Sequence, residues 1–507
     1  MILRRRSIKW VAALVVVGVC VGWPVRAHFR AKARLAAYKQ RLKAAGEKMT
    51  VADAAPTPSL EAIQAGQDLL LASTYLVPVS WSNLPPTMRY LGGGKAIVCW
   101  QQPVLGEGNS TNVWPGLRAE MARNTEALEN VRLVLHAPAI EYNLDYRQGA
   151  MLLLPHLARL KGIAQQLMAA AILDLHEGRV TNAMDNLLAL TALARVPRDE
   201  PIMISELVRV AVAAIADGAT WAALQSNDCS EPQLQLLQTA WQNLDFYTQA
   251  EGALSMERIT AEQYVQQARQ SASVARSLFA AGSSPNSALA ELAELGKGVL
   301  ENPHEGLRAL LNRYPGLWIW RYWGSYDDEL AAAEVTQAGI ECVRQARAHE
   351  PLALALKGFV NKCARVHPDS GMLLVFGSTN VVQHYLQRIE WMEIQRALTV
   401  TAIALKRFQL RHGAYPAALS ELVPEYVVQV PTDPIDGRPL RYRLRGDGAY
   451  LLYSVGEDGE DNNGDPAAPP DTPKQQWVRG RDAVWPMPAS AEEIRAYESK
   501  LKFLPLK

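Results

Sequence analysis

The chain has 507 residues, of which 49% are hydrophobic and 20% are charged, and its formal net charge is +1. This length and composition predict a folded protein with a sizeable buried core rather than a disordered chain. The nearly neutral balance lacks the basic excess of an electrostatic nucleic-acid binder, and we expect no nucleic-acid partner.

The N-terminus predicts a membrane segment. Residues 10–25 carry no charge and follow Arg4, Arg5, Arg6 and Lys9. The run has 16 residues, slightly short of the roughly 17–25 of a comfortable span. We expect an uncleaved signal anchor that makes the chain a single-pass protein of a bacterial cytoplasmic membrane.

Two other interpretations of this segment stay open. A cleaved signal peptide would use Val25-Arg26-Ala27 as a loose small-x-small site. A lipoprotein site at Cys20 is disfavoured because the bulky Val19 stands directly before it. The flanking basic residues lie on both sides of the run, so they leave its orientation nearly undecided.

A mainly α-helical domain is expected over residues 28–384, built of helical hairpins. Ser59 is a predicted helix N-cap, and residues 166–195 are predicted to form a hairpin that turns at Gly178. Residues 77–115 are instead rich in proline and glycine, which predicts an irregular loop with short β pieces. Its three tryptophans are expected to pack over the helices, with a ligand groove as the alternative: Trp81, Trp100 and Trp114.

An aromatic run in residues 318–326 precedes Asp327, Asp328 and Glu329. Acidic residues favour the start of a helix, so the cluster is expected to be structural. The alternative is an envelope hydrolase whose site lies in residues 318–329. Each His-Glu pair in the chain lacks the second histidine of a zinc-peptidase motif, and no other recognisable catalytic motif occurs, so we do not expect an enzyme.

The five cysteines are scattered, without CxxC or zinc-site spacing. Cys20 lies in the apolar run. The other four either pair in an oxidising compartment or, as we expect for most of them, are buried as small apolar residues.

The C-terminal part carries an ordered series of motifs. A long helix from Glu390 to Arg411 is followed by Tyr415-Pro416, a Leu-rich helix, and Pro431-Thr432-Asp433-Pro434. Two strands joined by Arg445-Gly446-Asp447-Gly448 come next, and an acidic segment from Ser454 to Asp465 ends the series. In this order the motifs resemble the C-terminal domain of the major pseudopilin of type II secretion systems. The resemblance covers about residues 385–480 and implies a small α+β module with a short antiparallel sheet, of an exported type.

The resemblance also implies that the acidic loop binds calcium. It assigns the ligands in decreasing order of weight to Asp458, Asp465, Asp461 and the carbonyl group of Ser454. The loop chemistry agrees, because five carboxylates and several glycines between Ser454 and Asp465 could supply the oxygen ligands that calcium requires. A solvated acidic turn without metal is the alternative.

The chain departs from that family at its N-terminus, which lacks the short leader followed by phenylalanine and glutamate. A polymerising fibre subunit is therefore not expected. We expect an envelope protein of structural or interaction type, possibly associated with secretion, with most of the chain in the periplasm and with protein partners that the sequence does not identify. The domain scheme that follows has four parts: 1–27 signal anchor, 28–384 helical domain, 385–480 pseudopilin-like module, and 481–507 tail with a short helix starting at Ser490.

Overall fold

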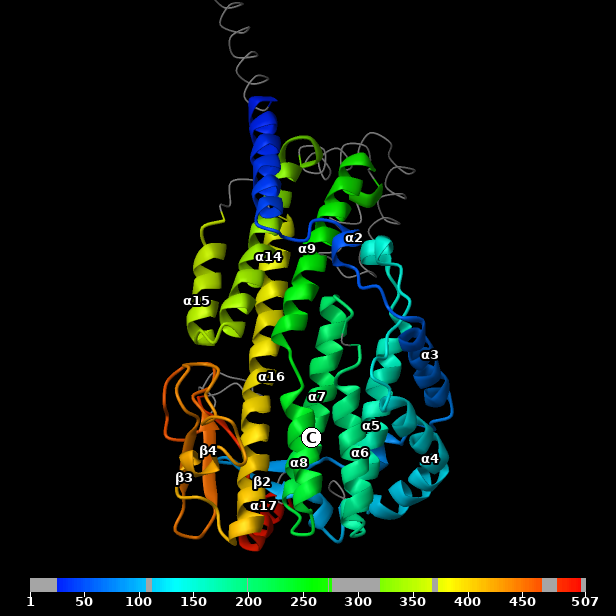
Figure 1. Cartoon of the computed structure of the whole chain (residues 1–507), viewed down its shortest axis with the longest axis vertical. Coiled ribbons are helices and arrows are strands. Elements are labelled where there is room, and N and C mark those ends of the chain that lie inside the picture. The colour runs from blue at the N-terminus through cyan, green and yellow to red at the C-terminus, as the bar shows by residue number, and fades with distance from the viewer. Residues whose placement is uncertain are drawn as a thin grey trace, which may run out of the picture.

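A computed structural model of the chain describes residues 25–105, 112–197, 199–271, 273–275, 320–366, 373–466 and 481–502. The expected membrane run, residues 10–25, falls almost entirely outside these ranges. The described protein is mainly helical and has two small three-stranded sheets near one end (Figure 1).

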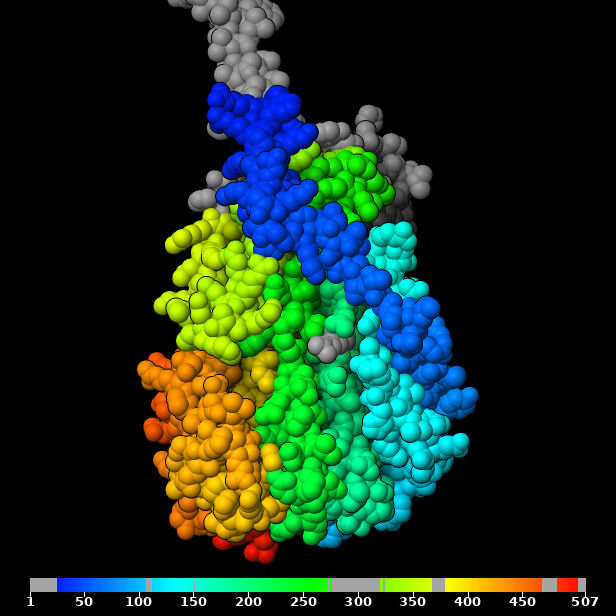
Figure 2. Space-filling model, viewed as in Figure 1, coloured from blue at the N-terminus to red at the C-terminus, as the bar shows by residue number. Residues whose placement is uncertain are grey.

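The first described helix, residues 25–44, stands at one end of the molecule (Figure 1). The sheets and the C-terminal helix lie at the opposite end. Figure 2 shows the same arrangement on the surface, where this helix rises above the body and the next segment crosses it. The order continues with α2 (Val51–Ala54) and α3 (Leu60–Thr74), and the Ser59 side chain caps α3 as predicted.

One side of the body consists of the five helices α4 to α8, which pack on one another. The expected hairpin is formed by α5 (Pro155–His176) and α6 (Val180–Leu193), and Gly178 in its turn has a φ of +74°. The bounds of the other helices are α4 (Val113–Leu135), α7 (Met203–Leu224) and α8 (Glu231–Gln242).

On the other side, the helix α14 contacts several other helices. α9 (Tyr247–Gln270) lies along α14 (Ser325–Arg347), and α15 (Leu352–Cys363) covers α14 from outside. The 40-residue α16 (Leu373–His412) packs against α14, α7 and α8 and joins both sides into one core. The expected module boundary at residue 385 therefore falls inside a helix that belongs to this core.

Two small sheets connect distant parts of the chain. β1 (Met88–Gly92) and β2 (Lys95–Val98) form an antiparallel hairpin in the expected irregular loop, and the late strand β6 (Met487–Pro488) pairs parallel to β2. The second sheet contains β3 (Arg441–Leu444), β4 (Tyr450–Ser454) and β5 (Ala483–Val484), all antiparallel.

The C-terminal tail is consequently part of both sheets. The Trp221 indole of α7 donates to the carbonyl of Pro486 at 2.7 Å, and Lys95 forms an ion pair with Glu493 of α17 (Ala491–Lys502). The predicted capping box of this helix is present, because Glu493 N–H donates to Ser490 Oγ and Ser490 N–H donates to Glu493 Oε2.

Among the described helices, α7 is the one that is long and apolar enough to cross a membrane. Most of its apolar window is buried between α5, α6 and α16, as in the core helix of a folded body. The four described cysteines are free: Cys99, Cys229 and Cys342 are buried, and Cys363 is half-buried.

Candidate functional site: the acidic loop and the seam of the N-terminal helix

The acidic loop begins where β4 ends, and a buried carboxylate fixes that point. Asp433 is fully buried and accepts hydrogen bonds from Ser454 Oγ at 2.7 Å and from Val455 N–H at 2.9 Å. Arg441 Nη1 also donates to Asp433 Oδ2 at 3.1 Å. The Ser454 hydroxyl therefore binds the buried Asp433 rather than an acidic residue of the loop.

The three predicted carboxylate ligands bind different protein groups. Asp458 accepts from the Glu460 N–H at 3.0 Å and from Asn462 Nδ2 at 3.1 Å. Asp461 accepts from the Asn463 N–H and from the Tyr453 hydroxyl. These hydrogen bonds, the first of them most, hold the pKa of Asp461 below its usual range.

Arginines also neutralise two of these carboxylates. Arg441 Nε lies 3.6 Å from Asp461, and Arg481 Nη1 lies 3.0 Å from Asp465. Asp458 is exposed and has no arginine or lysine partner within the described ranges. The loop is thus partly balanced by cations of its own chain, and Asp458 is the predicted ligand that remains most accessible.

The carboxylate at the centre of the loop is Asp482, which sequence reasoning did not select. Its side chain is nearly fully buried and accepts from the backbone N–H groups of Asn462, Gly464 and Asp465 at 3.2, 2.6 and 3.2 Å. Burial raises its pKa. It lies two residues past the expected end of the module, and its neighbours in sequence carry no metal-site pattern.

The tail segment at Arg481 packs closely against the start of the acidic loop. A Cβ on Gly456, whose φ is +65°, would lie 1.8 Å from the carbonyl oxygen of Arg481. Only glycine fits this approach, so Gly456 is required by the tail as well as by the turn.

The positions of the predicted ligands bear directly on the calcium site. Within the part of the chain that the structure describes, no three His, Cys, Asp or Glu side chains are grouped to hold a metal ion. Asp458, Asp461 and Asp465 are therefore not gathered into such a group in this structure.

The carboxylates of the aromatic–acidic cluster also have partners. Asp327 pairs with Arg34 at 2.6 Å, and Glu329 pairs with Lys39 at 2.5 Å. Asp328 accepts from the buried Trp320 indole at 2.5 Å, and burial raises the pKa of Asp328 to about 6. Residues 318 and 319 of the expected cluster lie outside the described ranges.

These contacts form a seam between helix 25–44 and the pair α9–α14. Arg269 of α9 pairs with Glu329 and lies over the Tyr326 ring, 3.9 Å from its centroid. Farther along, the buried Glu47 pairs with Arg344 at 2.5 Å and accepts from Gln337 at 3.0 Å. We define the docking seam as Arg34, Lys39 and Glu47 with Asp327, Glu329 and Arg344.

The docking seam leaves little open space. The hollow between helix 25–44 and α9–α14, lined by Lys39, Glu262 and Glu329 among others, has a volume of about 10 Å³. That is roughly the space of one water molecule. The carboxylates of the seam therefore act in packing and charge pairing in this structure.

Comparison of the chain with family models, with curated proteins and with solved structures gives no match, so the pseudopilin resemblance rests on the motifs of residues 385–480 alone.

Proposed function

We propose that this chain is a single-pass protein of the bacterial cytoplasmic membrane whose helical body lies in the periplasm and binds protein partners. The observation that carries the proposal is the docking seam. Helix 25–44 directly follows the apolar run 10–25. This helix is paired with α14 through Arg34 and Lys39 and with α9 through Lys39, and the loop after it is paired with α14 through Glu47. An anchor joined to the body in this way would hold the body in one orientation at the membrane.

A membrane-extraction experiment tests the anchor. We expect the full chain to remain in the membrane pellet after alkaline carbonate treatment. Replacing Leu14 and Val16 together by Asp should release most of it, because each aspartate at the centre of a span costs about 2.5–3.5 kcal/mol. Replacing the same two residues by Ala is the matched control and should leave the chain in the pellet. Release of the unchanged chain by carbonate would contradict the anchor.

The carboxylates at 327–329 are engaged in ion pairs and hydrogen bonds, which favours an interaction role over the hydrolase alternative. The three carboxylates at 327–329 bind Arg34, Trp320, Lys39 and Arg269, and the adjoining hollow has room for about one water. No observation favours a reaction at this place. An association with secretion follows only from the resemblance of residues 385–480.

We also propose, from that resemblance, that the acidic loop binds calcium with Asp458 as the main ligand. The density of carboxylates and the exposure of Asp458 support this. Since Asp461 and Asp465 face Arg441 and Arg481, binding through all three requires the loop to rearrange.

Thermal unfolding of the full chain in detergent tests the calcium site. With calcium at about 100 times its dissociation constant, we expect roughly 2.7 kcal/mol of stabilisation over chelator, and none with magnesium. Asp458→Ala should abolish the rise in melting temperature. Asp447→Ala, which removes an exposed carboxylate from the β3–β4 turn, should retain it. Equal effects of calcium and magnesium, or a rise that survives Asp458→Ala, would contradict this site.

A further inference from the structure

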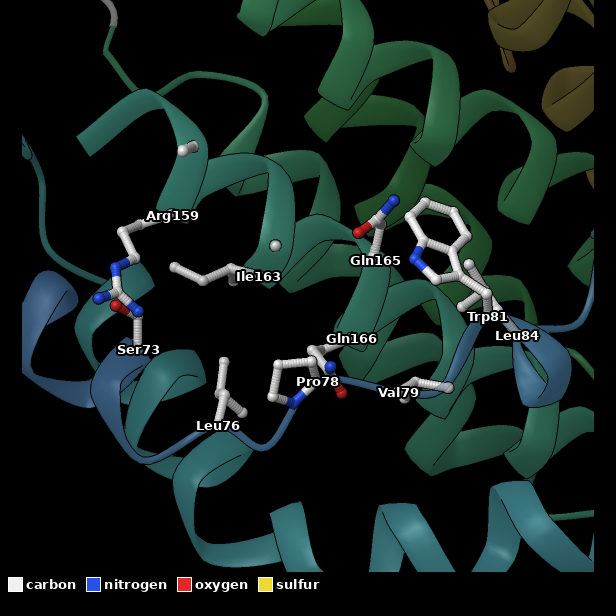
Figure 3. A pocket seen from close by; sticks show the side chains of 12 residues that line it. Ser73, Leu76, Pro78, Val79, Trp81, Leu84, Arg159, Ile163, Gln165 and Gln166 are labelled. Atoms are coloured by element: carbon white, nitrogen blue, oxygen red, sulfur yellow. The ribbon is translucent and has the colours of Figure 1, made fainter. Parts of the chain in front are cut away.

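A groove beside α5 lies apart from the acidic loop and the docking seam. Its volume is about 210 Å³ (Figure 3). Trp81 and Leu84 lie at one end, Arg159 at the other, and Leu76, Pro78 and Ile163 between them. The groove thus combines an apolar middle with an aromatic end and a cationic end.

The loop that forms one wall is clamped by buried polar groups. Asn124 of α4 accepts from the N–H of Val77 at 2.9 Å and donates to its carbonyl at 2.8 Å, and Gln166 of α5 donates to the same carbonyl. Asn124 is fully buried and Gln166 is nearly so. Because a buried polar side chain must be satisfied, these residues hold the loop in one position at Val77.

A second clamp lies directly beside Trp81. Glu120 of α4, which is also buried, accepts from Ser80 N–H at 3.1 Å, Ser80 Oγ at 2.6 Å and Asn83 Nδ2 at 2.9 Å. Asn83 packs so closely on Gly116 that a Cβ there would lie 2.7 Å from its amide. The residues on both sides of Trp81 are therefore fixed, although Trp81 itself is not covered.

Trp81 is 82% exposed, contrary to the expectation that it packs over the helices. Tyr75 and Leu71, in the preceding turns of the same segment, are 66% and 57% exposed. A single exposed apolar residue is ordinary. An exposed aromatic side chain on a loop whose neighbouring residues are held by two buried clamps, at the edge of an apolar hollow, is typical of a binding surface. The rigid loop would lose little entropy when a ligand binds.

The opposite end of the groove supplies positive charge. Arg159 is exposed and forms no ion pair with any residue in the described ranges, and the same holds for Lys161 two residues along α5. The groove follows α5 from Arg159 to Gln166, a length of about 10 Å at 1.5 Å per residue. An extended peptide covers this distance with about three residues.

We propose that this groove binds an extended segment of a partner protein in which an apolar side chain is followed, within about three residues, by a carboxylate. The apolar side chain would enter the hollow between Pro78 and Ile163 against the Trp81 ring. The carboxylate would meet the Arg159 guanidinium, whose planar fork suits it. The inference rests on the proposed interaction function and specifies the surface and the chemistry of the partner.

Selection from a library of random displayed heptapeptides tests this proposal. The full chain in detergent micelles is compared with Trp81→Ala, with Arg159→Glu and with Val428→Ala, a matched change at a distant residue that is 90% exposed. The affinities of selected peptides are then measured by fluorescence anisotropy. All three variants change exposed side chains, so their unfolding free energies should stay within about 0.5 kcal/mol of the unchanged chain.

We expect enriched peptides that pair a large apolar residue with Asp or Glu. Their affinity should fall at least tenfold in Trp81→Ala and stay unchanged in Val428→Ala. Arg159→Glu should remove the preference for the acidic residue. The proposal is overturned if no sequence is enriched over Trp81→Ala, or if the enriched sequences bind Arg159→Glu equally well. The assay does not depend on membrane orientation, so its failure is distinguishable from failure of the anchor.

Discussion

At the scale of single residues, several carboxylates are buried without a cation beside them. Glu390 of α16 is 5% exposed, and burial followed by repulsion from Glu457 of the acidic loop raises its pKa to about 8. A carboxyl group whose pKa is higher in the folded state binds a proton more tightly there. Its contribution to stability is therefore lost as the pH rises from about 4.5 to about 8.

Glu390→Gln should remove this pH dependence. We expect the variant to lie within about 1 kcal/mol of the unchanged chain near pH 5 and to be more stable by up to about 4 kcal/mol at pH 8, because Glu390 is fully ionised there only in the unfolded chain. Denaturant unfolding at a series of pH values measures the difference. Glu457→Gln removes only the smaller, repulsive cause and should change the pH dependence less. A difference between Glu390→Gln and the unchanged chain that is constant with pH would show that Glu390 does not titrate as described.

Features that depend on neighbouring residues were predicted correctly, whereas contacts between residues far apart in the sequence were missed. The caps at Ser59 and Ser490 depend on neighbours within three residues, so the sequence was sufficient. Asp482 accepts from backbone groups 17 to 20 residues away, across residues 467–480, and its own surroundings give no sign of this. The positions of Asp461 and Asp465 likewise depend on Arg441 and Arg481, which the loop motif does not include.

At the scale of elements, helix 25–44 and α16 have different roles from those that the sequence indicated. Lys39 and Arg34 of helix 25–44 pair with carboxylates of α9 and α14, contacts that the sequence did not indicate. The helix that resembles the start of a pseudopilin module extends to Leu373 and packs in the main core. Periodicity predicts that such helices exist, but not which partners their faces meet.

The buried ion pair of Glu47 and the exposed ion pair of Arg34 in the docking seam should contribute differently to the free energy of unfolding. The Glu47 side chain is 4% exposed and faces Arg344 and Arg258, whereas the Arg34 side chain is 64% exposed. Glu47→Gln removes the carboxylate that forms an ion pair with the buried Arg258 and should destabilise the chain by about 3 kcal/mol. Arg34→Gln removes a solvated pair and should change stability by less than about 1 kcal/mol.

Denaturant unfolding of both variants in the same detergent measures this contrast. Losses of equal size, or no loss in Glu47→Gln, would show that the seam does not fix helix 25–44 to the body as the ion pairs indicate.

At the scale of the whole molecule, the two ends of the chain belong to one helical body. The tail pairs with both sheets, and α16 joins the two sides of the core. Helix 25–44 stands at the end opposite the sheets, so a membrane beyond it would leave the acidic loop and much of the body directed away from the bilayer (Figure 1). The groove at Trp81 lies on this body, where the proposed partner segment could reach it.

The side of the membrane on which the body lies tests the account most directly. Single cysteines at Leu60 and Val428, which are 85% and 90% exposed, are introduced into a chain with Cys363→Ser. Spheroplasts of a Gram-negative host are then treated with a membrane-impermeant maleimide, with and without lysis, and the buried Cys342 serves as an internal control. If the body lies in the periplasm as proposed, both introduced cysteines react fully without lysis. Reaction only after lysis would place the body in the cytoplasm and contradict this proposal.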